Sequence, residues 1–311
     1  MNFQRRRGTM RRHLVIILSL LGLLTLTARG NQFRFPVKSN SVRFAAIGDM
    51  GTGGAAQYEV AQQMIAARQT FPFDFVIMLG DNIYGGSGPK DFQKKFELPY
   101  KPLLDAGVKF YASLGNHDSS KELSYAPFNM NGQSYYTFKK GNVRFFVLNS
   151  NYMDPTQLAW LDKQLHDAGT GDWKICYFHH PLYSSGKTHG SSVELRKLIE
   201  PLFVKYGVDA VFSGHDHVYE RVKPQKGIYY FTEGSSGQLR NGDLARTNLT
   251  AKGFDTDRTF MLVEIAGDEM YFETLSRTGT EVDSGVLPRV KHSIISPSSA
   301  APAAFRQNQT R

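Results

Sequence analysis

The sequence predicts an α/β protein, a four-layer α/β/β/α sandwich of two mixed sheets in one domain. Continuous apolar runs of strand length alternate with helix-like segments through residues 42–212, and strand-like runs dominate from residue 218 onward. Continuously apolar strands are expected where both faces of a sheet are covered. Two packed sheets with helices outside meet that requirement. With 311 residues, 41% of them hydrophobic, the chain is long enough to bury a large core.

The first half of the predicted domain contains one clear helix and several strands. Residues 55–68 are helix-like and lie between two apolar runs. Residues 85–107 contain no clear run, and we expect them to form a loop over the functional site. The predicted strands are residues 42–47, 75–79, 108–114, 134–138 and 143–148.

The second half adds two helices and further strands. Asp154 followed by Pro155 is a helix start, because aspartate caps helix N-termini well and proline suits the first helical position. This helix should end near Ala168, and the second covers residues 193–205. Residues 236–258 are expected to form a second loop over the site. The predicted strands are residues 173–178, 209–212, 227–232, 260–265 and 270–275.

The basic charge of the chain is concentrated at its N-terminus. Residues 1–30 contain six arginines and no acidic residue, so removing them reduces the formal net charge from +9 to +3. The remaining chain has no basic run suited to a phosphate backbone, and no nucleic-acid partner is expected. Arginines followed by the apolar stretch of residues 14–28 have the order of an export signal.

We therefore predict an exported protein, periplasmic or secreted. Arg11 and Arg12 resemble a twin-arginine signal. The apolar stretch is short for a membrane-spanning helix, which needs about 20 residues. Leu26, however, stands where a cleavage site prefers a small residue, so the alternative is an uncleaved N-terminal membrane anchor. Contact with a membrane is expected only in that case.

The predicted domain organisation follows from these composition changes. Residues 1–30 form a signal peptide or membrane anchor, residues 31–41 a linker and residues 42–285 the folded domain. Residues 286–311 are rich in Ala, Pro, Ser and Gln near their end, and we expect a disordered tail. Cys176 is the only cysteine, which excludes an intramolecular disulfide. A monomer is favoured.

Side chains able to bind metal ions follow five of the apolar runs. Carboxylate, amide, imidazole and phenolate groups gathered at strand ends can hold two hard or borderline cations side by side. Such a pair suits hydrolysis at phosphorus. The seven residues are Asp49 in VRFAAIGDMG, Asp81 and Tyr84 in FDFVIMLGDNIYGG, Asn116 in VKFYASLGNHD, His179 in WKICYFHHP, and His215 and His217 in VDAVFSGHDHVYER.

Two neighbouring cations repel each other unless an anion bridges them. One carboxylate must therefore reach both, and Asp81 in the central GDN block is the candidate. A glycine precedes four of the five blocks, at positions 48, 80, 115 and 214. The missing side chain should let the backbone turn sharply at the strand end and let a substrate approach.

The five blocks together resemble the calcineurin-like metallophosphoesterase superfamily and, within it, the purple acid phosphatases. The order GDxG, GDNxxY, GNHD, HxP and GHxHxYER carries the resemblance, which covers residues 42–285 as a metallophosphoesterase domain. Tyr84 marks the subgroup, since most members of the superfamily have no tyrosine ligand at this place. In the subgroup the phenolate binds ferric iron and gives the visible colour.

The resemblance also implies how the ligands divide between two metal ions. The first site would hold Fe(III), and the second Fe(II), Zn or Mn. Asp81 would belong to both. The implied first set is Asp49, Asp81, Tyr84 and His217, and the second set is Asp81, Asn116, His179 and His215.

On the substrate side, the resemblance implies three further residues. His117 would face the phosphate, with Asp118 beside it as an orienting partner. His189 resembles a second substrate-side histidine. His180 departs from the tyrosine or serine usual between His179 and proline, and is expected behind the ligands. The acidic residues Asp216 and Glu220 are expected to support the site or to pair with Arg221.

The predicted function is that of an exported acid phosphatase. Phosphate monoesters would be hydrolysed by in-line attack of a metal-bound hydroxide, with the metals neutralising charge on the equatorial oxygens. A phosphodiesterase acting on nucleotides or phospholipid headgroups with the same metals is the alternative. A non-catalytic phosphate-binding protein on the same scaffold is the third hypothesis.

Overall fold

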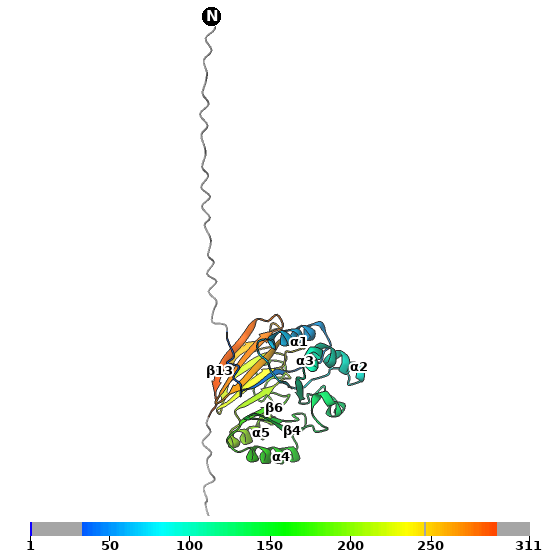
Figure 1. Cartoon of the computed structure of the whole chain (residues 1–311). Coiled ribbons are helices and arrows are strands. Elements are labelled where there is room, and N and C mark those ends of the chain that lie inside the picture. Colours follow the sequence, from blue (N-terminus) through cyan, green and yellow to red (C-terminus); the bar gives the residue numbers. More distant parts are fainter. Residues whose placement is uncertain (2–32, 246, 291–311) are drawn as a thin grey trace, which may run out of the picture. The chain divides into compact units, whose positions relative to one another are not determined.

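The computed structural model describes Met1, residues 33–245 and residues 247–290. The predicted leader and the part of the predicted tail from residue 291 therefore lie outside the described residues. Residues 33–290 form two mixed sheets with helices outside them (Figure 1). The predicted fold class is confirmed.

The first sheet has six strands in the order β13-β12-β11-β1-β2-β3. Its three strands β1, β2 and β3 run parallel, so their carboxyl ends lie at one edge. The other strands pair antiparallel beyond β1. The strands are β1 Val42–Ile47, β2 Phe75–Met78, β3 Lys109–Ala112, β11 Thr259–Ala266, β12 Glu269–Ser276 and β13 Glu281–Pro288.

The second sheet has seven strands in the order β10-β8-β9-β7-β6-β5-β4. Strands β5, β6, β7 and β9 are parallel, and the remaining strands pair antiparallel at the two sides. The strands are β4 Tyr136–Lys140, β5 Val143–Val147, β6 Trp173–Tyr177, β7 Ala210–Ser213, β8 Tyr219–Gln225, β9 Ile228–Glu233 and β10 Thr250–Phe254.

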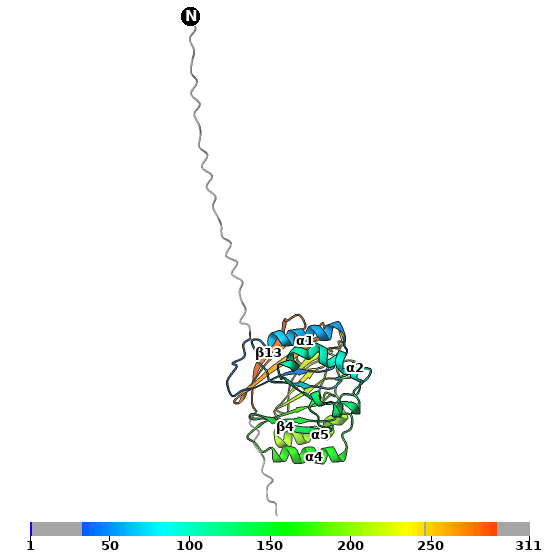
Figure 2. The same ribbon diagram turned by 45° about the vertical axis from the view of Figure 1, so that its right-hand side comes forward.

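Helices cover the outer face of each sheet. Helices α1 (Ala55–Ala67) and α3 (Leu98–Asp105) pack on the first sheet. Helices α4 (Pro155–Asp167) and α5 (Val193–Tyr206) pack on the second. Figure 2 shows the two pairs on opposite sides of the strands. The short helix α2 (Pro89–Phe92) continues into α3 through one π-helical turn.

Three apolar clusters correspond to the three interfaces between these four layers. The middle cluster lies between the sheets and is rich in aromatic rings. The ring of Phe44 lies 5.4 Å from the rings of both Phe75 and Phe145, which joins strands of the two sheets. The other two clusters lie beneath the helices. Burial of this apolar surface is the main source of stability.

Several sequence predictions differ from the structure in detail. Asp154 caps α4 as predicted, since its Oδ1 accepts from Gln157 N at 2.8 Å. The stretch 85–107 contains α2 and α3, and the stretch 236–258 contains β10. Strand β13 reaches Pro288, three residues past the predicted domain boundary.

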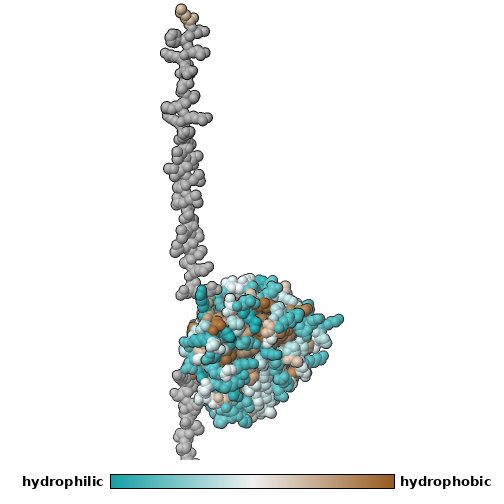
Figure 3. Space-filling model, in the orientation of Figure 1, coloured by the Kyte–Doolittle hydropathy of each residue, from teal (hydrophilic) through white to brown (hydrophobic). Residues whose placement is uncertain are grey.

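The linker segment packs on the domain. The carboxylate of Glu264 accepts from the backbone N–H groups of Val37 at 2.9 Å and Lys38 at 2.8 Å. The Phe35 ring lies 4.0 Å from the Phe71 ring. Among the described residues, no helix has the length and apolar character needed to cross a membrane. Hydrophilic residues predominate on the face seen in Figure 3, with apolar ones scattered between them.

A partly buried ion pair joins the two sheets. Asp283 of β13 accepts from Arg221 Nε at 2.7 Å and Nη2 at 3.1 Å, and from the Tyr219 hydroxyl at 2.8 Å. Both partners belong to β8 in the other sheet. Arg221 therefore does not pair with Asp216 or Glu220. That pairing was one of the two alternatives predicted for these acidic residues. Its guanidinium instead fixes the position of one sheet relative to the other.

We predict that Asp283→Ala lowers the free energy of unfolding by roughly 2–3 kcal/mol, because it leaves the guanidinium of Arg221 and the hydroxyl of Tyr219 without their acceptor. Denaturant unfolding measures this loss. Glu281→Ala, on an exposed position of the same strand, is the control and should change stability by less than about 0.5 kcal/mol. Equal effects of the two substitutions would contradict the role of the inter-sheet pair.

Candidate metal centre

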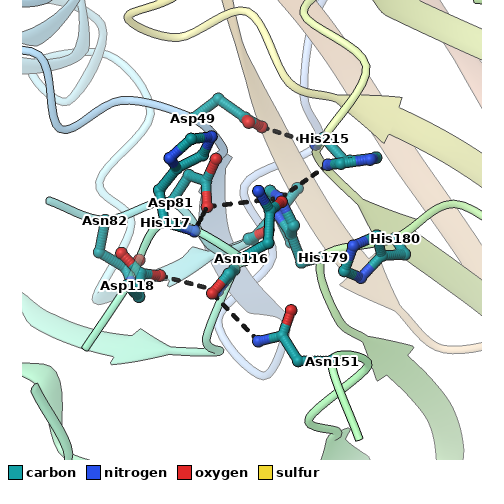
Figure 4. Close-up of polar contacts among 12 residues, drawn as sticks. Asp49, Asp81, Asn82, Asn116, His117, Asp118, Asn151, His179, His180 and His215 are labelled. Atoms are coloured by element: carbon teal, nitrogen blue, oxygen red, sulfur yellow. Dashed lines mark hydrogen bonds and ion pairs between the residues drawn. The ribbon is translucent and has the colours of Figure 1, made fainter. Parts of the chain in front are cut away.

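The predicted metal-binding residues meet where the parallel strands of both sheets end. Asp49 follows β1 and Asp81 follows β2 in the first sheet. His179 follows β6 and His215 follows β7 in the second. Figure 4 shows these four side chains, with Asn116, directed toward one another from the two sheets. The two sheets thus supply opposite sides of one site.

Three of these residues have backbone conformations that residues other than glycine rarely adopt. The φ angles of Asp49, Asp81 and His215 are 53°, 51° and 69°. This left-handed region is strained for residues other than glycine, and such strain concentrates at functional sites. The ligand residue itself therefore makes the sharp turn at each of these strand ends.

Only one of the four preceding glycines makes the sharp turn that was predicted for them. Of the glycines at 48, 80, 115 and 214, only Gly80 has a positive φ, at 88°. The others are needed because the chain packs against them. A Cβ atom on Gly115 would lie 2.2 Å from Asp81 Oδ1, and one on Gly214 would lie 2.4 Å from Asp49 Oδ2. The glycines leave room for the two carboxylates.

One group of donors surrounds the Asp49 carboxylate. The Tyr84 hydroxyl lies 3.1 Å from Asp49 Oδ1 and 3.3 Å from His217 Nε2. His217 Nε2 in turn lies 3.3 Å from Asp49 Oδ1. One ligand atom each from Asp49, Asp81 and His217 fall within 4.8 Å of one another. A carboxylate, a phenol and an imidazole thus converge on one point, with Asp81 next to them.

A second group of donors surrounds His179. Its Nδ1 donates to the Leu79 carbonyl at 2.9 Å. In the neutral imidazole this leaves Nε2 without a proton. That nitrogen lies 3.0 Å from Asn116 Oδ1, 3.1 Å from His215 Nδ1 and 3.5 Å from Asp81 Oδ1. Lone pairs facing one another in this way are the arrangement that a bound cation satisfies.

The electrostatics of the site also suit cations. Burial, and then the charge of Asp81, raises the pKa of Asp49 well above its ordinary value. Burial lowers the pKa of His215 to about 2 and that of His217 to about 4, so both imidazoles are neutral. Neutral imidazoles with free lone pairs, beside buried carboxylates that repel each other, form a donor set that fits metal ions.

His117 and Asp118 occupy different positions. His117 is exposed, its backbone N–H donates to Asp81 Oδ1 at 2.9 Å, and its ring lies 5.0 Å from the Tyr84 ring. The Asp118 carboxylate accepts from Gly115 N at 2.8 Å and Ile83 N at 3.1 Å. Both of its oxygens hold the two ligand loops together, and a role in orienting His117 stays a prediction.

Two further histidines lie against His215. The ring of His189 stacks on that of His215 at 4.1 Å, and the ring of His180 lies 4.4 Å from it. His180 Nδ1 is 2.9 Å from the hydroxyl of Ser150. His189 is exposed, whereas His180 is partly buried behind the donors. The structure thus brings every predicted site residue to one place.

Sequence analysis missed several residues that hold the site in position. Asn82 Nδ2 donates to the Ser113 carbonyl at 2.8 Å and to Asp118 Oδ2 at 2.9 Å. Asn151 Nδ2 donates to the Gly115 carbonyl at 3.0 Å. Asn82 stands beside a predicted ligand, which is a signal that could have been used. Asn151 lies far from any motif and has no such signal.

The segment 236–240 belongs to a loop that was predicted to lie over the site, but its contacts with the ligand-bearing segments were not predicted. Its alternate N–H groups donate to backbone carbonyls of the site: Ser236 N to Gly48 O at 3.1 Å, Gln238 N to Asp49 O at 3.0 Å, and Arg240 N to His217 O at 3.0 Å. This segment clamps the strand ends that carry the ligands. Burial, and then the charge of Arg240, lowers the pKa of His217.

Asp216 and Glu220 support the loop that carries His189. The Asp216 carboxylate accepts from the Ser184 hydroxyl at 2.5 Å, and that of Glu220 accepts from Ser185 N at 2.7 Å. Both carboxylates are buried. Their predicted supporting role agrees with these contacts.

Comparison with known proteins places this arrangement in context. The profile of the family described as Calcineurin-like phosphoesterase matches residues 42–219. Tartrate-resistant acid phosphatase type 5 of Rattus norvegicus is 26% identical over 302 residues, covering 81% of this chain and 91% of the rat protein. Purple acid phosphatase 7 of Arabidopsis thaliana is 26% identical over 269 residues, covering 74% of this chain and 81% of the plant protein.

Two solved structures share the fold. GAP50, the anchor in the inner membrane complex of Plasmodium, superposes with a TM-score of 0.71 at 21% identity, covering 82% of this chain and 90% of that chain. The purple acid phosphatase PPD1 from yellow lupin (Lupinus luteus) seeds superposes with a TM-score of 0.68 at 21% identity, covering 82% of this chain and 55% of that chain.

We predict that Gly115→Ala reduces the metal content of the purified protein, because the new Cβ atom would displace the carboxylate of Asp81. Elemental analysis by mass spectrometry gives the metal per chain. Gly171→Ala is the matched control, since a Cβ at Gly171 meets no atom within 4 Å. Full metal occupancy in Gly115→Ala would contradict the tight packing of Asp81.

Proposed function

The chain belongs to the calcineurin-like phosphoesterase family, and we propose that it is an exported acid phosphatase that hydrolyses phosphate monoesters at a pair of metal ions. The family predicted from the five motifs is confirmed by the profile match and by the purple acid phosphatase relatives. The observation that carries the proposed function is the convergence of seven donor side chains from the two sheets, with Asp81 between the other six.

The donor chemistry supports two sites of different character. The group around Asp49 contributes a phenol and carboxylates, which are hard ligands suited to Fe(III). The group around His179 contributes two imidazoles and an amide, which suit Fe(II), Zn or Mn. Asp81 adjoins both groups. When bound, the two cations would supply the positive charge that stabilises the transition state of phosphoryl transfer and would activate water.

The protein's own residues supply the remaining steps. Hydrolysis joins the oxygen of water to phosphorus and breaks the bond between phosphorus and the leaving-group oxygen, which then takes up a proton. His117 is exposed beside the donors, with its backbone held by Asp81, and its imidazole can deliver that proton. His189, stacked on His215, lines the other side and can donate a hydrogen bond to the phosphate.

We predict that the metal-loaded protein hydrolyses p-nitrophenyl phosphate faster than bis(p-nitrophenyl) phosphate, and that Asp81→Ala lowers the activity by more than about 100-fold, together with the content of both metals. Release of p-nitrophenol measures both rates. Asp105→Asn on the exposed surface of α3 is the control.

Faster turnover of the diester would favour the phosphodiesterase. Two bound metals without activity from about pH 4 to pH 9 would favour the non-catalytic phosphate-binding protein.

We predict that the oxidised, iron-loaded protein absorbs broadly in visible light and that Tyr84→Phe abolishes the band, because the phenolate is the ligand expected to give the colour. Absorption spectra recorded with metal analysis of the same samples separate loss of the phenolate from loss of iron. Tyr152→Phe, which removes an exposed hydroxyl, should leave the band unchanged. A colourless iron-loaded wild type would reject Tyr84 as a ligand of Fe(III).

A further inference from the structure

A cavity of about 520 Å³ opens beside the donor group around His179. The predicted ligand Asn116 lines it, and the segment that follows β5 forms one of its walls. Its volume is within the range of small-molecule binding pockets. Its lining includes Asn116, Ser150, Asn151, Tyr152, His180 and Leu195.

The wall of this cavity is fixed to the site by hydrogen bonds. Asn151 Nδ2 donates to the Gly115 carbonyl at 3.0 Å, next to the predicted ligand Asn116. The Ser150 hydroxyl lies 2.9 Å from His180 Nδ1. The Tyr152 carbonyl accepts from Gln157 Nε2 at 2.7 Å, so its backbone is tied to the first turn of α4. The cavity is therefore formed without a rearrangement of its backbone.

The lining has two chemical properties. Tyr152 exposes 77% of its surface, and Leu195 adds an aliphatic group, so the cavity presents apolar area to a ligand. None of the residues that line it in the described part of the chain is a lysine or an arginine. The carboxylate of Asp118, which also borders the cavity, is occupied by backbone N–H groups. A second anionic group placed there would find no opposite charge.

We propose that this cavity, the leaving-group pocket, binds the uncharged organic part of the phosphate ester, with Tyr152 as a specificity-determining residue. The substrate class that fits is a monoester of an aryl or other apolar alcohol. Esters whose leaving group carries a further phosphate or carboxylate fit less well. This inference rests on the proposed phosphatase function and narrows its substrate class.

Aromatic and anionic leaving groups differ in the interaction free energy that they gain in the leaving-group pocket. An aromatic leaving group can pack on the ring of Tyr152 and bury area that is now exposed. An anionic leaving group loses water and gains no cation in return, which is unfavourable. Discrimination between aromatic and anionic leaving groups therefore has two sources, the attractive contact with the ring of Tyr152 and the lack of a cation in the pocket.

Steady-state kinetics of metal-loaded Tyr152 variants tests the inference. For Tyr152→Ala we expect kcat/KM for p-nitrophenyl phosphate to fall by roughly 3- to 10-fold, mainly through KM, with little change for glycerol 2-phosphate. Tyr152→Phe retains the ring and should behave as wild type. Inhibition by inorganic phosphate, which has no leaving group, should be the same in all three proteins.

A second variant adds the charge that the pocket lacks. Tyr152→Arg should raise kcat/KM for a substrate with an anionic leaving group, inorganic pyrophosphate, relative to p-nitrophenyl phosphate. Leu98→Ala, at an exposed apolar position on α3 that does not line the pocket, is the control for general surface effects.

The outcomes separate this inference from the proposed function. A wild type that hydrolyses no ester rejects the phosphatase function. An active wild type whose ratio of p-nitrophenyl phosphate to glycerol 2-phosphate hydrolysis is unchanged in Tyr152→Ala rejects the leaving-group pocket. Weaker phosphate inhibition in Tyr152→Ala would also reject it, because Tyr152 would then act on the phosphoryl group itself.

Discussion

The position of Asp81 is the constraint on which the rest of the site depends. Its carboxylate lies 2.9 Å from the N–H of His117 and 3.5 Å from His179 Nε2, while Asp49 is buried close by. Two buried carboxylates that lie close together repel each other unless a cation lies between them or one of them takes up a proton. The order of the strand ends and the binding of metal ions are therefore linked thermodynamically, since each makes the other more favourable.

The fold has to hold its ligands in conformations that an isolated chain would avoid. Each non-glycine residue in the left-handed region costs on the order of 1 kcal/mol or more, and Asp49, Asp81 and His215 all adopt it. Such strain persists only where the surroundings over-determine the backbone. Here the parallel strands fix one side of each turn, and the carboxylate of Asp118 accepts hydrogen bonds from two of the ligand loops. The segment 236–240 donates backbone hydrogen bonds to the residues at these strand ends.

What could be predicted from the sequence depended on signals that are local. The strands were recognisable because they are continuously apolar, and the ligands because polar side chains follow such runs. Helix α3 was missed because Pro99 and Pro102, which usually mark loops, lie within it, Pro99 in its first turn where proline is tolerated. Strand β10 was missed because it is a half-exposed edge strand with few apolar residues. The pairing of Arg221 with Asp283 joins residues 62 positions apart, and no local pattern reports it.

Charged side chains are distributed unequally between the two sides of the metal centre. On the side of His217 and His189, the charge of Arg240, second to burial, lowers the pKa of both imidazoles, and the carboxylates of Asp216 and Asp243 act in the opposite direction. On the side of Asn116 and His180, none of the described residues that line the cavity is a lysine or an arginine. An ester with its dianionic phosphoryl group at the metal donors and its neutral alcohol in the cavity is complementary to this difference between the two sides.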